Sequence, residues 1–184
     1  GGGQPVSIRT AIRNGISPKD ILSVVWLART DMEQVGFDAA TGVKRFAATA
    51  TGRDNAVVQR IMDEVVAQGN GTGDEKNVGN VYYNIGVATM AASVRAAELA
   101  LEAHGAPLTG PKLKQGFEMI EDFNADGLMP PITITQKDHQ GGGYGRVSMW
   151  TGDSWEPQTD WIAAYQDIVW EEIESDAAKF EQGN

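Results

Sequence analysis

The predicted fold is decided by three consecutive stretches: Ile132-Thr133-Ile134-Thr135, Asp138-His139-Gln140-Gly141-Gly142-Gly143 and Gly145-Arg146-Val147-Ser148-Met149-Trp150. Apolar and polar residues alternate on both sides of the glycine-rich turn, which is typical of a half-buried β-hairpin. No helix start and no P-loop lysine follow the glycines, so the pattern does not predict a phosphate-binding loop. We therefore expect two antiparallel strands here, followed by a closing helix.

Two further strands are expected nearer the start of the chain. A helix over 6–13 precedes Ile21–Trp26, an apolar run of the kind that is buried on both faces of a parallel sheet. Leu27–Glu33 is polar and irregular, and Asp38–Thr49 indicates a turn that leads into another strand. A helix that leads into a strand is half of a βαβ unit, which favours an α/β fold.

The middle of the chain is predicted to be helical. Apolar positions on one face predict a helix over Asn55–Ala67, capped by Asp54. The clearest helix spans Val78–Ala103, where many alanines allow close packing, and a shorter one is expected over Pro111–Glu121. Only two expected strands precede these helices, which is too few to cover them with a parallel sheet.

Composition excludes several kinds of function. The 184 residues carry a formal net charge of -10 at pH 7 and a pI near 4.6, which argues against nucleic-acid and anionic-membrane binding. The chain has no cysteine, and its two histidines lie in different segments, so neither a metal site nor a cofactor is expected. The sequence contains no apolar run of about 18 residues, so no transmembrane helix is predicted.

Polar residues after the first expected strand form one candidate site. Trp26, Arg29, Thr30, Asp31 and Glu33 follow the carboxyl end of that strand, where open α/β sheets hold ligands. An aromatic wall, a cation and two carboxylates could hold a small zwitterion by complementary hydrogen bonds. A solvated loop with weak local ion pairs is an equal alternative.

The start of the long helix is a second candidate, because it offers free backbone amides and aromatic rings. We expect Tyr82 to belong to the core, and Tyr83 and Asn84 to face a ligand. Aromatic residues late in the chain are expected to fasten the hairpin and the closing helix to the body: Trp150, Trp155, Trp161, Tyr165 and Trp170.

Asp138 and His139 are the only adjacent acid and imidazole. The preferred interpretation is a polar turn, in which Asp138 accepts backbone amides and His139 is exposed. The alternative is a hydrolytic α/β enzyme that uses Asp138, His139 and Glu33.

Several short motifs occur together in this chain. The hairpin is followed by Thr159-Asp160-Trp161-Ile162 and Asp167-Ile168-Val169-Trp170, and Ser17-Pro18-Lys19-Asp20 precedes the strand that ends in Trp26. Asp38-Ala39-Ala40-Thr41-Gly42-Val43, Tyr83-Asn84-Ile85-Gly86-Val87 and Leu108-Thr109-Gly110 complete the series. Their order and spacing resemble the carboxy-terminal half of the periplasmic solute-binding proteins of ABC importers, of the branched-chain-amino-acid type (type I periplasmic binding proteins).

The resemblance implies a two-lobed α/β fold with parallel sheets flanked by helices and a carboxy-terminal hairpin plus helix. Residues 1–51 would be part of lobe two, 52–128 part of lobe one, and 129–184 the return to lobe two with the hairpin and terminal helix. The first half of the family's sequence would then be missing. A processed, engineered or cut start is expected, because the chain opens on Gly1 without a methionine or a signal peptide. An amino-terminal segment or companion chain is expected to complete the fold.

The resemblance also implies a function. In this family the lobes close over a solute in the cleft between them, and the protein then docks on an inner-membrane ABC permease. Trp26 and the loop 29–33 would face the cleft from lobe two, Tyr83 from lobe one, and Gln4 would lie in a polar cleft loop. Asp31 or Glu33 could meet a ligand ammonium, while Arg29 nearby leaves a carboxylic acid without an amine open.

The chain is therefore expected to be a periplasmic solute binder and not an enzyme, with no cofactor and no nucleic-acid partner. A hydrolytic enzyme and a ligand-sensing receptor domain of the same fold are the alternatives.

Overall fold

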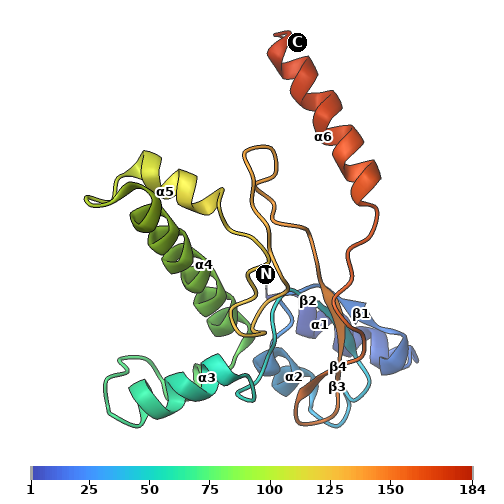
Figure 1. Cartoon of the computed structure of the whole chain (residues 1–184). Coiled ribbons are helices and arrows are strands. Elements are labelled where there is room, and N and C mark those ends of the chain that lie inside the picture. The colour runs from blue at the N-terminus through green and yellow to red at the C-terminus, as the bar shows by residue number, and fades with distance from the viewer. Residues whose placement is uncertain (1, 184) are drawn as a thin grey trace.

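The computed structural model describes residues 2–183, so Gly1 and Asn184 lie outside the described part. Two bodies lie beside one another, and a closing helix stands apart from both (Figure 1). The sheet body comprises residues 4–47 and 145–157, and the helical body comprises residues 55–129. The mixture of strands and helices confirms the predicted α/β class.

The sheet body contains four strands in the order β1 (Leu22–Ser23), β2 (Lys44–Ala47), β3 (Arg146–Trp150) and β4 (Trp155–Pro157). Strands β1 and β2 are parallel, and the other two pairs are antiparallel. The sheet is therefore mixed: the parallel pair expected near the start of the chain and antiparallel strands late in the chain join in one sheet. The turn Pro18–Asp20 is a short 3₁₀ helix before β1.

The predicted hairpin has a different first strand. The partners of β3 are β2 and β4, so both of its hydrogen-bonding edges are occupied. Ile132 instead forms an isolated bridge with Phe123, and the stretch Ile132–Thr135 stays outside the sheet. The alternating pattern identified β3 correctly, but it could not say which distant segment pairs with it.

Helices α1 (Gln4–Arg13) and α2 (Arg29–Val35) pack against each other beside the sheet. Helix α2 occupies much of the stretch that was expected to be irregular. Its start is fixed by Asp31, whose Oδ2 accepts a 2.7 Å hydrogen bond from the backbone N–H of Ala28. The predicted strand Ile21–Trp26 shrinks to two residues, and Leu22 is 63% exposed, so burial on both faces is also wrong.

Around Trp150 the sheet body forms its core, together with side chains of α1, α2 and the segment before β2: Ile8, Leu27, Met32, Val35, Ala40 and Val43. The indole N–H of Trp150 donates to the carbonyl of Phe37 at 3.0 Å. A second, separate core lies between α3, α4 and the segment after α5, and it includes Val58, Val78, Ala88, Ala125 and Leu128.

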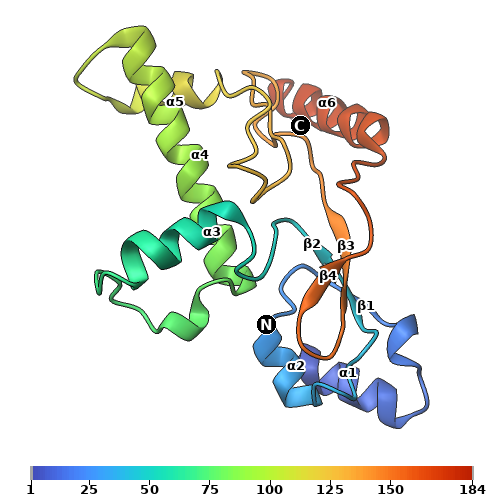
Figure 2. The same cartoon turned by 60° about the horizontal axis from the view of Figure 1, so that its bottom comes forward.

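The helical body follows the prediction closely. Helix α3 (Ala56–Ile61) continues into a π-helical turn, Met62–Val66, and its cap is Asn55, whose Oδ1 accepts from Val57 N, and not Asp54. After a 3₁₀ turn at Glu75–Asn77, α4 runs over Val81–His104 and packs against α5 (Gly110–Phe117). Figure 2 shows α4 and α5 together, away from the sheet.

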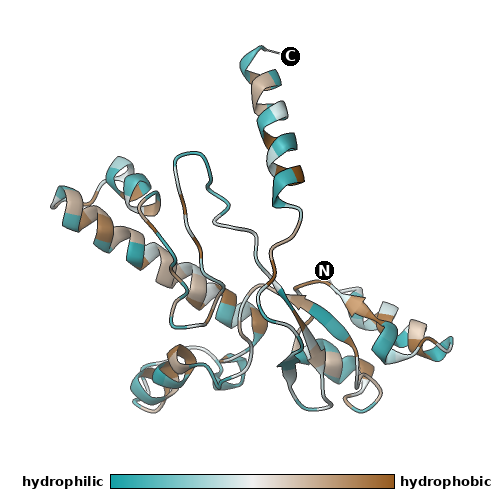
Figure 3. Cartoon of the chain, turned by 45° about the vertical axis from the view of Figure 1, so that its right-hand side comes forward, coloured by the Kyte–Doolittle hydropathy of each residue, from teal (hydrophilic) through white to brown (hydrophobic). Residues whose placement is uncertain are grey.

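The closing helix α6 (Gln166–Glu181) has no buried residue. Tyr165, which precedes it, is 74% exposed, so the expectation that this aromatic fastens the helix to the body is wrong. Both α4 and α6 carry apolar residues along their length (Figure 3). Within residues 2–183, no helix has the length and apolar character needed to cross a membrane.

Candidate functional site

The two bodies meet at a pair of aromatic rings. Trp26 lies between β1 and α2, and Tyr82 lies in the first turn of α4. Their rings stack with centroids 5.8 Å apart and planes 9° from parallel, and Tyr82 Oη donates to the carbonyl of Trp26 at 3.0 Å. Trp26 is 44% exposed and Tyr82 53% exposed, so a solute could reach both rings.

The sequence predicted that Tyr82 belongs to the core, and the structure shows that this prediction is wrong. The neighbouring Tyr83 is partly buried and packs against the helical core. A ligand contact by Tyr83 stays a prediction. The α4 periodicity contains the signal that sequence reasoning missed, because Tyr82 is one residue after the buried Val81 and two before the buried Asn84.

Asn84 holds the start of α4 on the segment that joins the two bodies. Its side chain is fully buried, and Nδ2 donates to the carbonyls of Ala50 at 2.9 Å and Gly52 at 3.2 Å. The N–H of Ala50 donates to Leu128 O at 2.7 Å, so this segment is also tied to the end of the helical body. Asn84 thereby fixes the position of Tyr82, while its predicted ligand contact stays untested.

Four of the residues predicted on the sheet body lie on α2, and two of these, Arg29 and Asp31, have side-chain partners within the chain. Arg29 lies 3.5 Å from Asp153 Oδ1 in the β3–β4 turn and stacks over the Phe37 ring at 4.7 Å. Asp31 caps α2 through the N–H of Ala28, as described above. Thr30 and Glu33 are exposed. A ligand contact by any of these four side chains stays a prediction.

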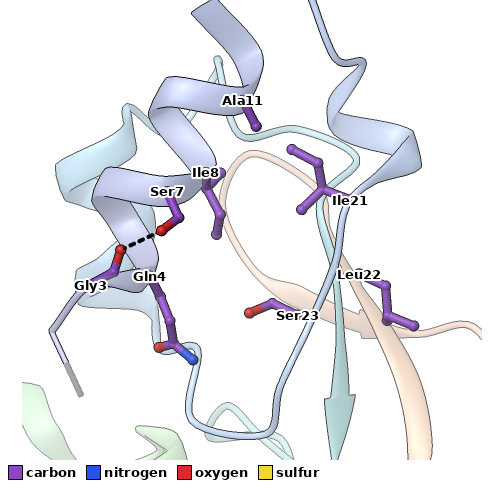
Figure 4. Close-up of a pocket in the computed structure, with 8 residues that line it drawn as sticks. All are labelled: Gly3, Gln4, Ser7, Ile8, Ala11, Ile21, Leu22 and Ser23. Atoms are coloured by element: carbon purple, nitrogen blue, oxygen red, sulfur yellow. Dashed lines mark hydrogen bonds between the residues drawn. The ribbon is translucent and has the colours of Figure 1, made fainter. Parts of the chain in front are cut away.

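Gln4 lines a different hollow. A cavity of about 460 Å³ lies between α1 and β1, and Figure 4 shows Gln4 and Ile8 facing Ile21 and Ser23 across it. Its full lining is Gly3, Gln4, Ser7, Ile8, Ala11, Ile21, Leu22 and Ser23. Neither Trp26 nor Tyr82 is part of this lining, and the cleft position of Gln4 stays a prediction.

Asp138 forms the predicted polar turn. Its Oδ1 accepts from the N–H of Gln140 at 2.7 Å and of Gly141 at 3.2 Å. The exposed His139 contacts Glu118 at 3.1 Å, and Lys114 binds the same Glu118 oxygen. Hydrogen bonds first from Lys114 and then from His139 lower the pKa of Glu118. The enzyme-like set is therefore not assembled, since Glu33 lies on α2.

A second cavity, of about 480 Å³, lies beside this cluster, between α5 and the segment that contains Ile134 and His139. It is lined by Gly110, Leu113, Lys114, Phe117, Glu118, Ile134 and His139. Among residues 2–183 there is no group of three histidine or acidic side chains that could hold a metal ion.

Arg45 is a functional candidate that sequence reasoning did not identify. It is fully buried on β2, and its guanidinium stacks 4.2 Å from the centre of the Trp155 ring. Burial lowers the pKa of Arg45 to about 9; the charge of Arg146 acts in the same direction, and Asp31 opposes both. The sequence did contain a signal: Arg45 lies two residues from both Val43 and Ala47, which places it on the apolar face of the strand.

Solved structures similar to this chain come from bacteria and an archaeon. An ABC transporter permease from the Pseudomonas fluorescens group shares 30% identity and a TM-score of 0.88, over 100% of this chain and 46% of that one. A branched-chain amino acid ABC transporter from Thermus thermophilus with bound valine shares 21% identity and a TM-score of 0.71, over 88% and 44%. An ABC transporter substrate-binding protein from Aeropyrum pernix shares 17% identity and a TM-score of 0.66, over 88% and 42%.

These likenesses confirm the resemblance inferred from the motifs. The chain has the type I periplasmic-binding-protein fold of branched-chain-amino-acid ABC transporter proteins, and it spans less than half the length of the structures that it matches. No protein-family model and no curated protein matches the sequence.

Proposed function

We propose that this chain is part of a periplasmic solute-binding protein of an ABC importer, which captures a small amino acid or carboxylic acid and delivers it to an inner-membrane permease. The fold supports this role, because similar structures include ABC transporter proteins of the substrate-binding type and one with bound valine. The single observation that carries the proposal is the Trp26–Tyr82 contact. It brings an exposed aromatic side chain from each body to one place.

The two bodies correspond to parts of the two lobes. We assign residues 1–51 to lobe two, 52–128 to lobe one, and 129–184 to the return and closing elements. The hydrogen bonds of Ala50, Gly52 and Leu128 support these limits, because they tie the segment that leaves the sheet body to the edge of the helical core. Few chain crossings join the cores, so one body could rotate against the other about these segments.

Solute capture would follow from closure of the two lobes. A solute that contacts both lobes stabilises the closed arrangement, and it does so only by its difference in affinity between open and closed forms. Trp26 and Tyr82 would supply flat apolar walls for an aliphatic side chain. Asn84 would keep Tyr82 in position, because it fixes the start of α4 to Ala50 and Gly52.

An amino-terminal segment or companion chain would complete the cleft. Helix α4 is apolar on both faces: alanines line its buried side, and Tyr82, Met90, Val94 and Leu101 are exposed on the other. A helix that is apolar all round belongs in the interior of a larger protein. The outer edge of β1 is also unpaired, and Leu22 and Val24 beside it are exposed. These surfaces fit the inner face of the remaining lobe segments.

Calorimetric titration with L-valine and L-isoleucine tests the proposal. We expect weak binding by the 184-residue chain alone and micromolar binding once the companion polypeptide is present. Tyr82→Ala should then weaken binding about tenfold, because one apolar wall is lost. Tyr144→Ala, which removes a partly exposed ring outside the contact, is the matched control.

Absence of binding in the completed protein, for these amino acids and for the corresponding carboxylic acids, would overturn the solute-binding role. Micromolar binding by the isolated chain would overturn the need for a companion.

A further inference from the structure

Unpaired hydrogen-bond donors are concentrated on one part of the sheet body and just after its strand β2. Within residues 2–183, six buried side-chain polar atoms have no hydrogen-bond partner in the protein. Five of them are able to donate: Arg45 Nε and Nη2, Thr49 Oγ1, Arg146 Nε and Trp155 Nε1. A buried donor without a partner is costly, so a cluster of them indicates a group that accepts hydrogen bonds.

The register places these side chains on one face of β2, β3 and β4. Arg45 is opposite Ser148, and Ala47 is opposite Arg146. Because side chains alternate along a strand, Arg45, Ser148 and Arg146 share a face. Trp150 lies two residues beyond Ser148 on this face, and its partner across the ladder is Trp155. Thr49 follows the end of β2 by two residues, beside the crossing segment at Ala50.

Two cations of this face have little negative charge around them. Arg45 Nη1 donates to the carbonyl of Leu27, and its guanidinium lies over Trp155. The guanidinium of Arg146 lies 4.4 Å from the centre of the Trp161 ring. Asp31 is the carboxylate that acts on Arg45, and one of its oxygens is already bound to the N–H of Ala28. Two buried or half-buried guanidinium groups against one carboxylate leave a net positive site.

We propose that Arg45, Arg146 and Trp155 form a carboxylate-binding site in the sheet body, and that it receives the carboxylate of the transported solute. Every unpaired group there can donate, and none is an acceptor only, so the site suits an anion and disfavours an ammonium. The planar fork of arginine matches the two oxygens of a carboxylate. Thr49 and Arg146 place the site at the end of the sheet nearest the crossing segment.

Assignment to the solute rests on the proposed function, whereas the anion site itself does not. An acidic side chain of the companion polypeptide would offer the same chemistry, so the experiment must separate the two sources. Arg45 Nη1 donates to the carbonyl of Leu27, the residue after Trp26, so the site lies beside the exposed aromatic pair formed by Trp26 and Tyr82. A carboxylate held there would leave room for an aliphatic tail against these rings, which would make a carboxylic acid with an apolar tail the solute class.

Thermal unfolding of the 184-residue chain tests the anion site. Sodium acetate and sodium isovalerate are compared with sodium chloride at equal ionic strength, and isoamylammonium chloride serves as the cationic analogue. We expect the two carboxylates to raise the Tm by about 3 °C at saturation, while chloride and the amine leave it unchanged. An equal rise with chloride, or no rise with either carboxylate, would overturn the site.

Three variants locate the effect. Arg146→Gln removes one half-buried cation and should abolish the carboxylate-dependent rise. Arg95→Gln removes a positive charge that is paired with Glu98 on α4, and it should retain the rise. Arg45→Lys keeps the charge but loses the planar donors, so the rise should fall without unfolding the chain. If Arg146→Gln kept the full carboxylate-dependent rise in Tm, the assignment of the carboxylate site to Arg146 would be overturned.

The completed protein separates this inference from the proposed function. If acetate stabilises the chain but no solute binds the completed protein, the anion site stands and the transport role fails. If amino acids bind the completed protein and Arg146→Gln leaves their affinity unchanged, the transport role stands and the solute assignment fails. Loss of the acetate effect on adding the companion without solute would assign the carboxylate to the companion and overturn its assignment to the solute.

Discussion

The sheet body and the helical body of this chain are held together in different ways. The sheet body buries large side chains, above all Trp150 on β3 and Arg45 on β2. The helical body buries small ones, and the inner face of α4 carries Ala88, Ala92, Ala96 and Ala100. In the first body stability depends on the volume of a few side chains, whereas in the second it depends on how closely two backbones approach.

Removal of the central ring should have the largest effect. Trp150→Ala leaves a cavity in the sheet body and removes the hydrogen bond to Phe37, so we expect a loss of about 4 kcal/mol in unfolding free energy. Denaturant unfolding followed by circular dichroism measures it. Phe180→Ala, at an exposed position on α6, should change stability by less than about 0.5 kcal/mol. Equal effects of the two would show that Trp150 is not the centre of the core.

Addition of one methyl group tests the helical body. A Cβ at Gly116 would overlap the carbonyl oxygen of Ala96 and lie 2.9 Å from the Cβ of Ala100, so α5 would have to move away from α4. We expect Gly116→Ala to cost about 3 kcal/mol. Gly110→Ala is the control, because nothing lies within 4 Å of the added atom there. If Gly116→Ala left the free energy of unfolding unchanged, the close approach of the α4 and α5 backbones would not be what stabilises the helical body.

The segment between the bodies depends on one amide. Asn84→Leu keeps the side-chain size roughly constant but leaves the carbonyls of Ala50 and Gly52 without this donor, which should cost about 2 kcal/mol. Hydrogen exchange should also become faster at Ala50 and Gly52, whose N–H groups donate to Leu128 and Gly79. Asn70→Leu, at an exposed position, should leave both measurements unchanged.

The smallest expected effect is a pH dependence confined to the helical body. Lys114 and His139 hold the pKa of Glu118 below its ordinary value of 4.5, so the ionised carboxylate stabilises the folded chain. This contribution is complete above the ordinary pKa and is lost as the pH falls through the lower folded value. Melting curves between pH 3 and pH 7 should therefore flatten in Glu118→Gln but not in Glu172→Gln. Parallel curves for Glu118→Gln and the unchanged chain would exclude this contribution.

The helices of the fold could be predicted largely from the sequence. Helices α1, α4 and α5 were found within a few residues, because their hydrogen bonds and apolar spacing are local properties of the chain. Helix α2 was missed because its capping acid, Asp31, was interpreted as a candidate ligand contact. Strand β3 was recognised, but its partners β2 and β4 were not, since pairing joins residues as far apart as Lys44 and Met149.

The candidate site was only partly accessible to sequence reasoning. Trp26 was identified from its place after a strand, whereas Tyr82 was assigned to the core because nothing local shows which face of α4 meets the other body. Asn84 was singled out, and its hydrogen bonds to Ala50 and Gly52 emerged only from the structure. The position of Arg45 between Val43 and Ala47 was a weak signal, and it was overlooked because a charged residue in a strand is usually exposed.

The sequence by itself determined the class of fold, the helical middle of the chain and the order of motifs that resembles a binding-protein half, because propensity and periodicity are read over a few neighbouring residues. Only the tertiary structure decided which strands pair, that Trp26 meets Tyr82, and that two arginines share a buried face. Those outcomes depend on the competition among distant segments for the same hydrogen-bonding edges and the same apolar surface, and no local pattern contains that competition.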